Sequence, residues 1–234
     1  MIIFLILLFC VIQSLFGVGL LLFGTPTFLL MGYSYEDTLV ILLPPSTMIS
    51  FIQTFLGLNL VDTKKLIFVY SIPMVVLGLI LVLNFGEDFK LETIVGIMLL
   101  AIVFIRASKK TKNYINMFVN KYIKISFLMT GFIHGISNMG GGFLAIINGV
   151  HHSDKDKIRA NIAFGYLFFA IIQLIILFFL KDKSFNIDNL FFTFMALCTY
   201  FLSENLFSKR LSNEKYQSMI TLILFIYSLL CIFL

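Results

Sequence analysis

The chain of 234 residues is 60% hydrophobic and only 12% charged, and its mean hydropathy is +1.03. Soluble domains are about 45–50% apolar and about 25% charged, so this composition excludes a soluble globular fold and indicates an all-α integral membrane protein. The net charge of +5 does not indicate a nucleic-acid partner, because the basic residues lie between apolar runs, where they report on membrane topology. The three cysteines lie in separate apolar runs and are interpreted as packing residues, and no metal or other cofactor is predicted.

Charged residues divide the chain into eight charge-free runs, which are residues 1–35, 38–61, 66–86, 93–105, 125–153, 160–180, 189–203 and 216–234. A membrane-spanning helix needs about 20 apolar residues. The two shortest runs reach this length if end residues such as Arg106 and Glu204 extend toward the headgroups. The pattern therefore predicts about eight transmembrane helices.

The first run, 1–35, and the fifth run, 125–153, are too long for a single span. As straight helices they would extend about 52 Å and about 43 Å, whereas the hydrocarbon core is about 30 Å thick. Each run also contains a glycine cluster. We expect each to be broken at its glycines into two half-helices that meet inside the membrane, with a re-entrant hairpin as the alternative.

A basic connector separates the fourth and fifth runs. No acidic residue lies between Thr93 and Ser153, and the interval holds Arg106, Lys109, Lys110, Lys112, Lys121 and Lys124. Because cytoplasmic loops are enriched in Lys and Arg, this connector is predicted to be cytoplasmic, with Lys109, Lys110 and Lys112 at anionic headgroups. Four spans on either side would then place both termini in the cytoplasm, and the plasma membrane is the expected location.

The two long runs align when the chain is shifted by 121 residues, so that Gln13 falls on His134 and Gly19 falls on Gly140. With a shift of 120, Gln53 meets Gln173. The pattern predicts a first repeat over residues 1–107, a connector over 108–124 and a second repeat over 125–234. The repeats are parallel if each contains four crossings and inverted if each break adds a crossing.

Corresponding interrupted segments in two halves are the best sequence indication of a transporter site. The amide groups at the start of a half-helix carry about half a positive charge and bind anions without a buried Lys or Arg. The candidate substrate-binding residues around the two breaks are Gln13, Gly17, Gly19, His134, Ser137, Asn138, Gly140, Gly141 and Gly142, and Asn161 at the start of the following segment joins them.

Several of these residues have structural alternatives. The glycines, together with Gly131 and Gly135, also suit close helix packing, and the buried amides also suit hydrogen bonds between helices. His134 is either a structural hydrogen-bonding residue or a proton carrier at membrane depth.

The glycine clusters resemble those of the TauE/SafE family of sulfite and organosulfonate exporters, which have a G-I-G-G-G-x-x-x-x-P pattern in the first segment of each of two repeats. The first cluster reads GVGLLLFGTP and matches at Gly17, Gly19 and Pro26; the second reads NMGGGFLAII and matches at Gly140, Gly141 and Gly142. Asn138 and Ile147 replace the first glycine and the proline of the second pattern. The resemblance covers nearly the whole chain and implies an exporter of small anions.

The predicted function is therefore a secondary transporter that exports a small anion such as sulfite or an organosulfonate. A permease for another small solute and a non-transporting membrane assembly protein are the alternatives. An enzyme is not expected, because His134 and Ser137 are the only nearby pair of a base and a nucleophile and no acidic residue accompanies them.

Overall fold

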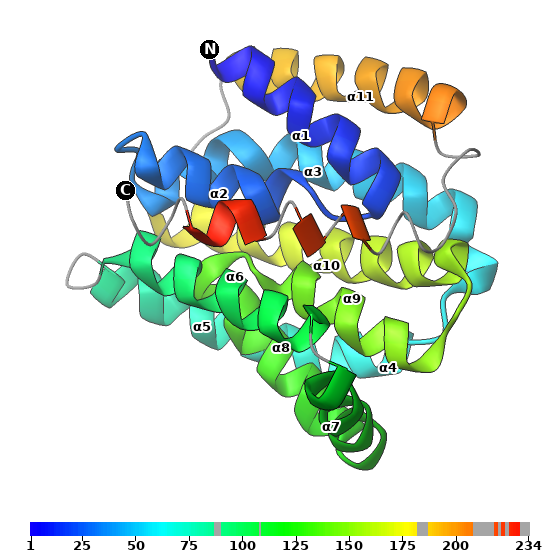
Figure 1. Ribbon diagram of the computed structural model, residues 1–234. Helices are drawn as coiled ribbons and strands as arrows, with labels where there is room; N and C mark the ends of the chain where they lie inside the picture. Colours follow the sequence, from blue (N-terminus) through cyan, green and yellow to red (C-terminus); the bar gives the residue numbers. More distant parts are fainter. Residues whose placement is uncertain are drawn as a thin grey trace.

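The computed structural model describes residues 1–86, 90–107, 109–181 and 187–207, together with 218–219, 221–222 and 225–229. In this part of the chain all regular structure is helical (Figure 1). The helices are α1 (Ile2–Phe16), α2 (Leu20–Leu30), α3 (Tyr35–Gly57), α4 (Lys64–Leu66), α5 (Ile72–Phe85), α6 (Leu91–Ala107), α7 (Lys109–Lys121), α8 (Ile123–Ser137), α9 (Gly140–His151), α10 (Lys155–Lys181) and α11 (Ile187–Phe207). A 3₁₀ turn, η1 (Leu58–Leu60), extends α3, and a π-helical turn, η2 (Ile67–Ser71), joins α4 to α5.

Three helical segments are long and apolar enough to cross a membrane, namely Tyr35–Leu60, Lys64–Phe85 and Lys155–Lys181. Shorter apolar helices accompany them, including α1, α2 and α8. Large apolar side chains such as Phe55, Phe104 and Phe194 are exposed on the outside of the bundle, as expected for a surface that faces lipid rather than water. The fold is that of a multi-pass membrane protein.

Helices α3 and α10 form the centre of the bundle and run antiparallel (Figure 1). At one end Lys181, the last residue of α10, forms an ion pair with Glu36 in the first turn of α3, with 2.9 Å between Nζ and Oε1. At the other end Gly57 lies against Ala160, where a Cβ on the glycine would come within 2.9 Å of the alanine Cβ. The start of α3 is defined by Ser34, whose hydroxyl accepts a hydrogen bond from the Asp37 amide, as is usual for a helix N-cap.

The first long run folds into a hairpin of α1 and α2. Gly17 ends α1 with a positive φ of 72°, a conformation that glycine adopts without strain. Gly19 then lies directly against the backbone of Gln13 and Phe9, so the chain has turned back along α1. The ring of Tyr227 contacts both Phe9 and Phe23, with centroid distances of 6.3 and 4.9 Å, whereas one straight helix would separate those two phenylalanines by about 21 Å.

The second long run turns at Asn138, whose φ of 60° makes it the one non-glycine residue with positive φ in the described part of the chain. His134, before the turn, and Gly141, after it, both lie against Tyr166 of α10. In both runs the hairpin, which was the alternative expectation, replaces two half-helices that meet end to end. The reason is packing, since each second helix buries its side chains against the first helix and its neighbours.

The packing of α8 also shows why its glycines are needed. A Cβ on Gly131 would overlap the Ser71 backbone, and one on Gly135 would overlap Val75 and Leu79. These two glycines allow α8 to pack closely on η2 and α5, as the GxxxG alternative predicted.

Candidate functional site

A cluster of buried amide and hydroxyl groups, called here the first cluster, lies at the turn of the α1–α2 hairpin. Gln13 is fully buried. Its Oε1 accepts a hydrogen bond from the Leu20 amide at the start of α2 (3.1 Å), and its Nε2 donates to the Ser50 hydroxyl of α3 (3.2 Å) and to Ser46 (3.3 Å). Gln53 donates to the Gln13 carbonyl at 3.2 Å. The cluster therefore satisfies backbone groups that the broken helix leaves without helical partners.

The second cluster lies at the turn of the α8–α9 hairpin and follows the same plan with different residues. His134 Nε2 is 3.3 Å from Gln173 Oε1, and Gln173 Nε2 donates to Asn138 Oδ1 at 2.9 Å. Asn138 Nδ2 in turn donates to the Thr25 hydroxyl of α2 at 3.0 Å. This last bond connects the two hairpins through a chain of neutral polar side chains.

Two polar atoms in the second cluster have no hydrogen-bond partner although both residues are fully buried. They are Nδ1 of His134 and the hydroxyl of Tyr166. The Tyr166 hydroxyl points at the Gly141 amide without completing a hydrogen bond, and Gly140 lies against the His134 ring. Because an amide oxygen only accepts, Nε2 of a neutral His134 donates to Gln173, and Nδ1 is left as an acceptor.

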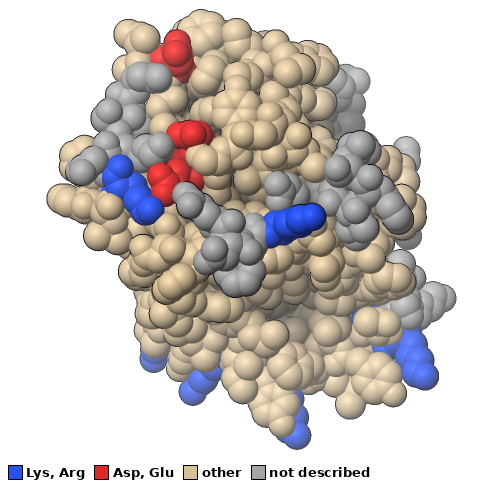
Figure 2. All heavy atoms as spheres, turned by 90° about the vertical axis from the view of Figure 1, so that its left-hand side faces the viewer, with Lys and Arg blue, Asp and Glu red and all other residues tan. Residues whose placement is uncertain are grey.

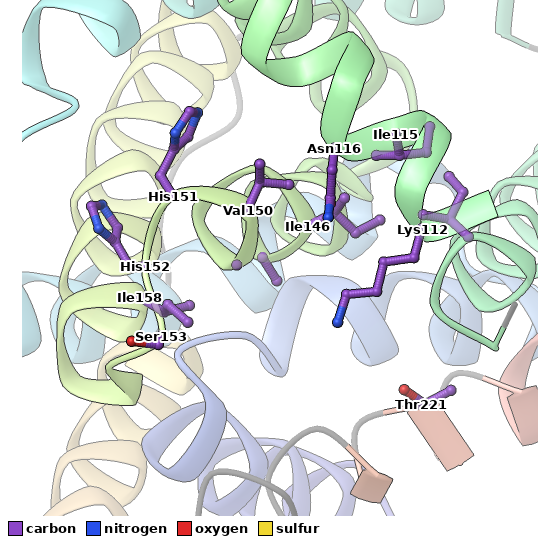
Figure 3. A pocket seen from close by; sticks show the side chains of 13 residues that line it. Lys112, Ile115, Asn116, Ile146, Val150, His151, His152, Ser153, Ile158 and Thr221 are labelled. Atoms are coloured by element: carbon purple, nitrogen blue, oxygen red, sulfur yellow. The ribbon is translucent and has the colours of Figure 1, made fainter. Parts of the chain in front are cut away.

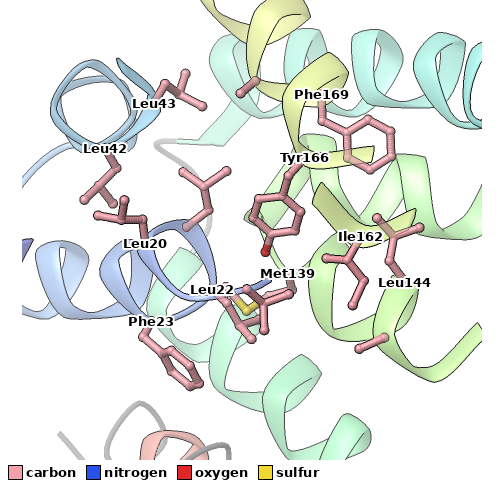
Figure 4. Close-up of a cluster of buried hydrophobic side chains, with 14 of the residues drawn as sticks. Leu20, Leu22, Phe23, Leu42, Leu43, Met139, Leu144, Ile162, Tyr166 and Phe169 are labelled. Carbon is pink, nitrogen blue, oxygen red and sulfur yellow. The ribbon is translucent and has the colours of Figure 1, made fainter. Parts of the chain in front are cut away.

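The surroundings of these two atoms are apolar. Figure 4 shows the Tyr166 ring between α10 and the other hairpin, with its hydroxyl directed toward Met139 and the first turn of α2. Leu20, Leu22 and Met139 are fully buried there. Buried polar atoms in such surroundings are costly unless they find a partner, which marks the start of α9 as a place where a ligand would be stabilised.

The structure brings together most, but not all, of the predicted site residues. Gln13 and Gly19 belong to the first cluster, and His134, Asn138, Gly140 and Gly141 to the second. Gly17 lies near the first cluster, with the Arg159 backbone beside it, and Gly142 packs on Ile102 of α6. Ser137 makes local bonds only, since its hydroxyl donates to the Ile133 carbonyl and accepts from the Met139 amide.

Asn161 lies apart from both clusters. Its Oδ1 accepts hydrogen bonds from the amides of Asp62 and Thr63, and its Nδ2 donates to the Leu60 carbonyl. It therefore holds the turn between α3 and α4 at one end of the bundle. In the same turn, burial disfavours ionisation of Asp62, but its contacts with Lys157 and His152 outweigh that effect and lower the pKa of the carboxyl group.

Sequence reasoning missed Tyr166, Arg159 and Tyr35. The Arg159 guanidinium, in the first turns of α10, donates to the Ser14 carbonyl at 2.5 Å and pairs with Glu204 at 2.8 Å. The Tyr35 hydroxyl, in the first turn of α3, donates to the Gly135 carbonyl at 3.2 Å. The two carbonyls are 121 residues apart, the same shift that aligns the hairpins, but the donors Arg159 and Tyr35 do not correspond under this shift, so the alignment gave no signal for them.

Three cavities are described, and none is lined by a residue of either hairpin turn. One, of about 350 Å³, lies between α3, α10 and α11; its lining includes Gln53, the residue that bonds to the end of α1, together with Arg159 and Glu204. A second, of about 430 Å³, is apolar and lies between α5, α6 and α8. The third, of about 580 Å³, lies beside α7 and α9.

Apolar helices, two interlocked hairpins and a neutral polar chain between them are features of a multi-pass membrane protein of the transporter class. The chain belongs to the TauE/SafE family, because the family model described as Sulfite exporter TauE/SafE matches residues 2–230. The resemblance inferred from the glycine motifs is thereby confirmed. No curated protein and no solved structure matches the chain.

Proposed function

We propose that the protein is a secondary transporter that exports a small anion, such as sulfite or an organosulfonate, and that it binds this anion at the second cluster beside the start of α9. The observation that carries the proposal is the pair of buried, unpartnered atoms there, His134 Nδ1 and the Tyr166 hydroxyl. The Tyr166 hydroxyl can donate a hydrogen bond to an oxyanion, and His134 Nδ1 would donate one only if the imidazole took up a proton when the anion binds.

The chemistry of the two clusters favours an anion over a cation. The side chains that form them are amides, hydroxyls and one imidazole, with no Asp or Glu among those described. A carboxylate is the usual partner of a bound cation. The amides at the start of α9 add partial positive charge without the cost of a fixed charge at membrane depth.

We further propose that residues 1–107 and 125–234 are two repeats of inverted topology joined by the connector 108–124. Three contacts support this. The corresponding central helices α3 and α10 run antiparallel; corresponding glutamines, Gln53 and Gln173, reach the ends of α1 and α8; and the carbonyls of Ser14 and Gly135 accept from the opposite repeat. In this proposal each repeat begins with a hairpin that enters and leaves on one side, in place of a full span.

The hairpins also change the proposed orientation. With each hairpin returning to its own side, α4, α7 and the starts of α8 and α10 share one end of the bundle, called here the basic end (Figure 1). Nine of the described basic side chains lie there and two lie at the opposite end; the nine are Lys64, Lys65, Lys110, Lys112, Lys121, Lys124, Lys155, Lys157 and Arg159, and the two are Lys90 and Lys181. We propose that the basic end is cytoplasmic, which places the N-terminus outside and replaces the earlier expectation for the termini.

The function is tested by sulfite efflux from proteoliposomes. The Tyr166→Phe substitution removes one hydroxyl and keeps the ring, so the fold is retained while a hydrogen bond to a charged ligand is lost. Such a bond contributes about 1.5–3 kcal/mol, so we expect transport at low sulfite concentration to fall at least about tenfold.

The matched control is Tyr33→Phe, since Tyr33 is a partly exposed tyrosine that packs on Phe28 at the end of α2. It should transport like the wild type. If Tyr166→Phe vesicles transported sulfite and taurine as fast as wild-type vesicles do, the proposed site would be contradicted. If wild-type vesicles transported neither anion, the proposed function would be contradicted.

A further inference from the structure

The connector helix α7 has features of a helix that lies in the membrane interface. Its residues Tyr114, Met117 and Phe118, at i, i+3 and i+4 spacing, are 62%, 69% and 40% exposed, while Val119 faces the protein and is buried. Lys110, Lys112 and Lys121 lie on the same helix. An exposed apolar stripe beside several lysines is typical of a helix whose outer surface inserts among lipid headgroups.

The cavity of about 580 Å³ opens beneath this helix. Its walls come from five places in the chain: α6, α7, α9, the segment that leads into the start of α10, and Thr221. Figure 3 shows the Lys112 amine projecting into it, with His151 and His152 on another side. Asn116, Ser153 and Thr221 add polar groups to the lining, and no acidic residue is among the described residues that form it.

The charges around the cavity favour an anionic group. The nearby carboxylate of Asp62 is already engaged, at 3.3 Å from His152 Nε2 and 3.0 Å from Lys157 Nζ. It therefore does not cancel the Lys112 charge by direct pairing. The aliphatic side chains of Ile105, Ile115, Ile146, Val150 and Ile158 form the remaining wall, which suits a ligand with a charged head and an apolar body.

We infer that this cavity binds the phosphate headgroup of an anionic phospholipid, with Lys112 as the principal cationic contact and the isoleucine wall along the acyl chains. A free phosphate shares the headgroup chemistry, but it would leave the apolar wall unused. The site lies at the end of the bundle that carries most of the described lysines, where anionic lipids of the cytoplasmic leaflet would meet it. It is separate from both hairpin clusters and does not depend on what the protein transports.

The experiment measures lipid binding by the purified full-length protein with native mass spectrometry and thermal unfolding in detergent. Phosphatidylglycerol should bind and raise the melting temperature more than phosphatidylcholine does. Because a lysine near an anionic surface contributes about 1 kcal/mol, Lys112→Ala should weaken phosphatidylglycerol binding about fivefold, and Lys112→Arg should largely restore it.

Lys110→Ala is the matched control, because Lys110 lies on the same helix but is not part of the cavity lining. It should bind phosphatidylglycerol like the wild type. Equal losses in the two alanine variants would overturn the site in favour of general surface charge, and no loss in Lys112→Ala would overturn it outright. If glycerol phosphate without acyl chains stabilises the protein as much as phosphatidylglycerol, the ligand is a free anion and the lipid assignment is wrong.

Discussion

Single backbone positions decide the shape of the hairpins. At Gly19 a Cβ would meet the amide nitrogen of Gln13 and the carbonyl oxygen of Phe9, both of which belong to the backbone of α1 and cannot move aside. Asn138 in the second hairpin corresponds to Gly17 in the first, since both have a positive φ, a conformation in which asparagine is among the better-tolerated residues. The Gly-Val-Gly and Asn-Met sequences thus provide the local turns, and close packing provides the reversal.

Gly19→Ala should destabilise the protein by more than about 2 kcal/mol, because overlap with backbone atoms forces the two helices apart. Gly149→Ala is the matched control, since Gly149 lies within α9 and nothing is within 4 Å of a Cβ there. That change should be neutral or stabilise the protein by up to about 1 kcal/mol. Unfolding in mixed micelles measures both, and equal stabilities of the two variants would show that the tight contact at Gly19 is unimportant.

At the scale of elements, much of the helical pattern could be predicted from charge spacing and run length, because the apolar parts of α3, α5 and α10 each correspond to one charge-free run bounded by charged residues. The direction of α2 and α9 could not be predicted in the same way. Run length shows only that 35 residues are too many for one span. A hairpin and two half-helices that continue in the same direction are equally compatible with that length. The choice depends on tertiary contacts such as Gly19 with Phe9 across the turn and Tyr227 with Phe23 from a distant part of the chain.

The residues of the candidate site likewise divide into those that the sequence indicated and those that it did not. The glycine spacing and internal alignment indicated Gln13, His134 and Asn138, all of which lie in the clusters. Tyr166 was not indicated, since an isolated tyrosine in an apolar helix has no sequence pattern that distinguishes it from a packing residue. Asn161 was also predicted as a binding residue, but it bonds to the turn at Asp62 and Thr63.

The bond between Asn138 and Thr25 connects the two hairpins, so its loss should weaken their association. Thr25→Val preserves shape and removes the acceptor, and we expect a loss of stability of about 1 kcal/mol. Thr193→Val is the comparison, because the Thr193 hydroxyl bonds only to the Asn189 carbonyl of its own helix among the contacts described. Denaturation in detergent should separate the two variants, and a larger effect at Thr193 would count against a link between the hairpins.

For the whole molecule, the two ends of the bundle differ in charge. Figure 2 views the end that contains the start of α3 and the end of α10, and its visible acidic and basic side chains are few and scattered over a largely uncharged surface. The lysines of α4, α7 and the first turn of α10 lie toward the other end. Counting charges along the sequence obscured this asymmetry, because it assumed that both long runs cross the membrane.

The proposed orientation is tested by cysteine labelling in intact cells. In a variant without native cysteines, Ser34→Cys at the opposite end should react with a membrane-impermeant maleimide. Asn113→Cys on α7 should react only after the cells are permeabilised; both positions are exposed in the structure. The reverse pattern would show that the connector faces outward.

The contacts of Lys181 at the end of α10 bear on the proposed transport. Lys181 joins Glu36 to the Leu83 carbonyl and so closes one end of the bundle. Shifted back by 121 residues, Lys181 corresponds to Leu60, and Leu83 shifted forward corresponds to Glu204; both of these counterparts line the cavity of about 350 Å³ at the basic end. Matching positions in the two halves therefore form an ion pair at one end of the bundle and line a cavity at the other, and under the proposed function a solute that leaves at the Lys181 end would have to separate this ion pair.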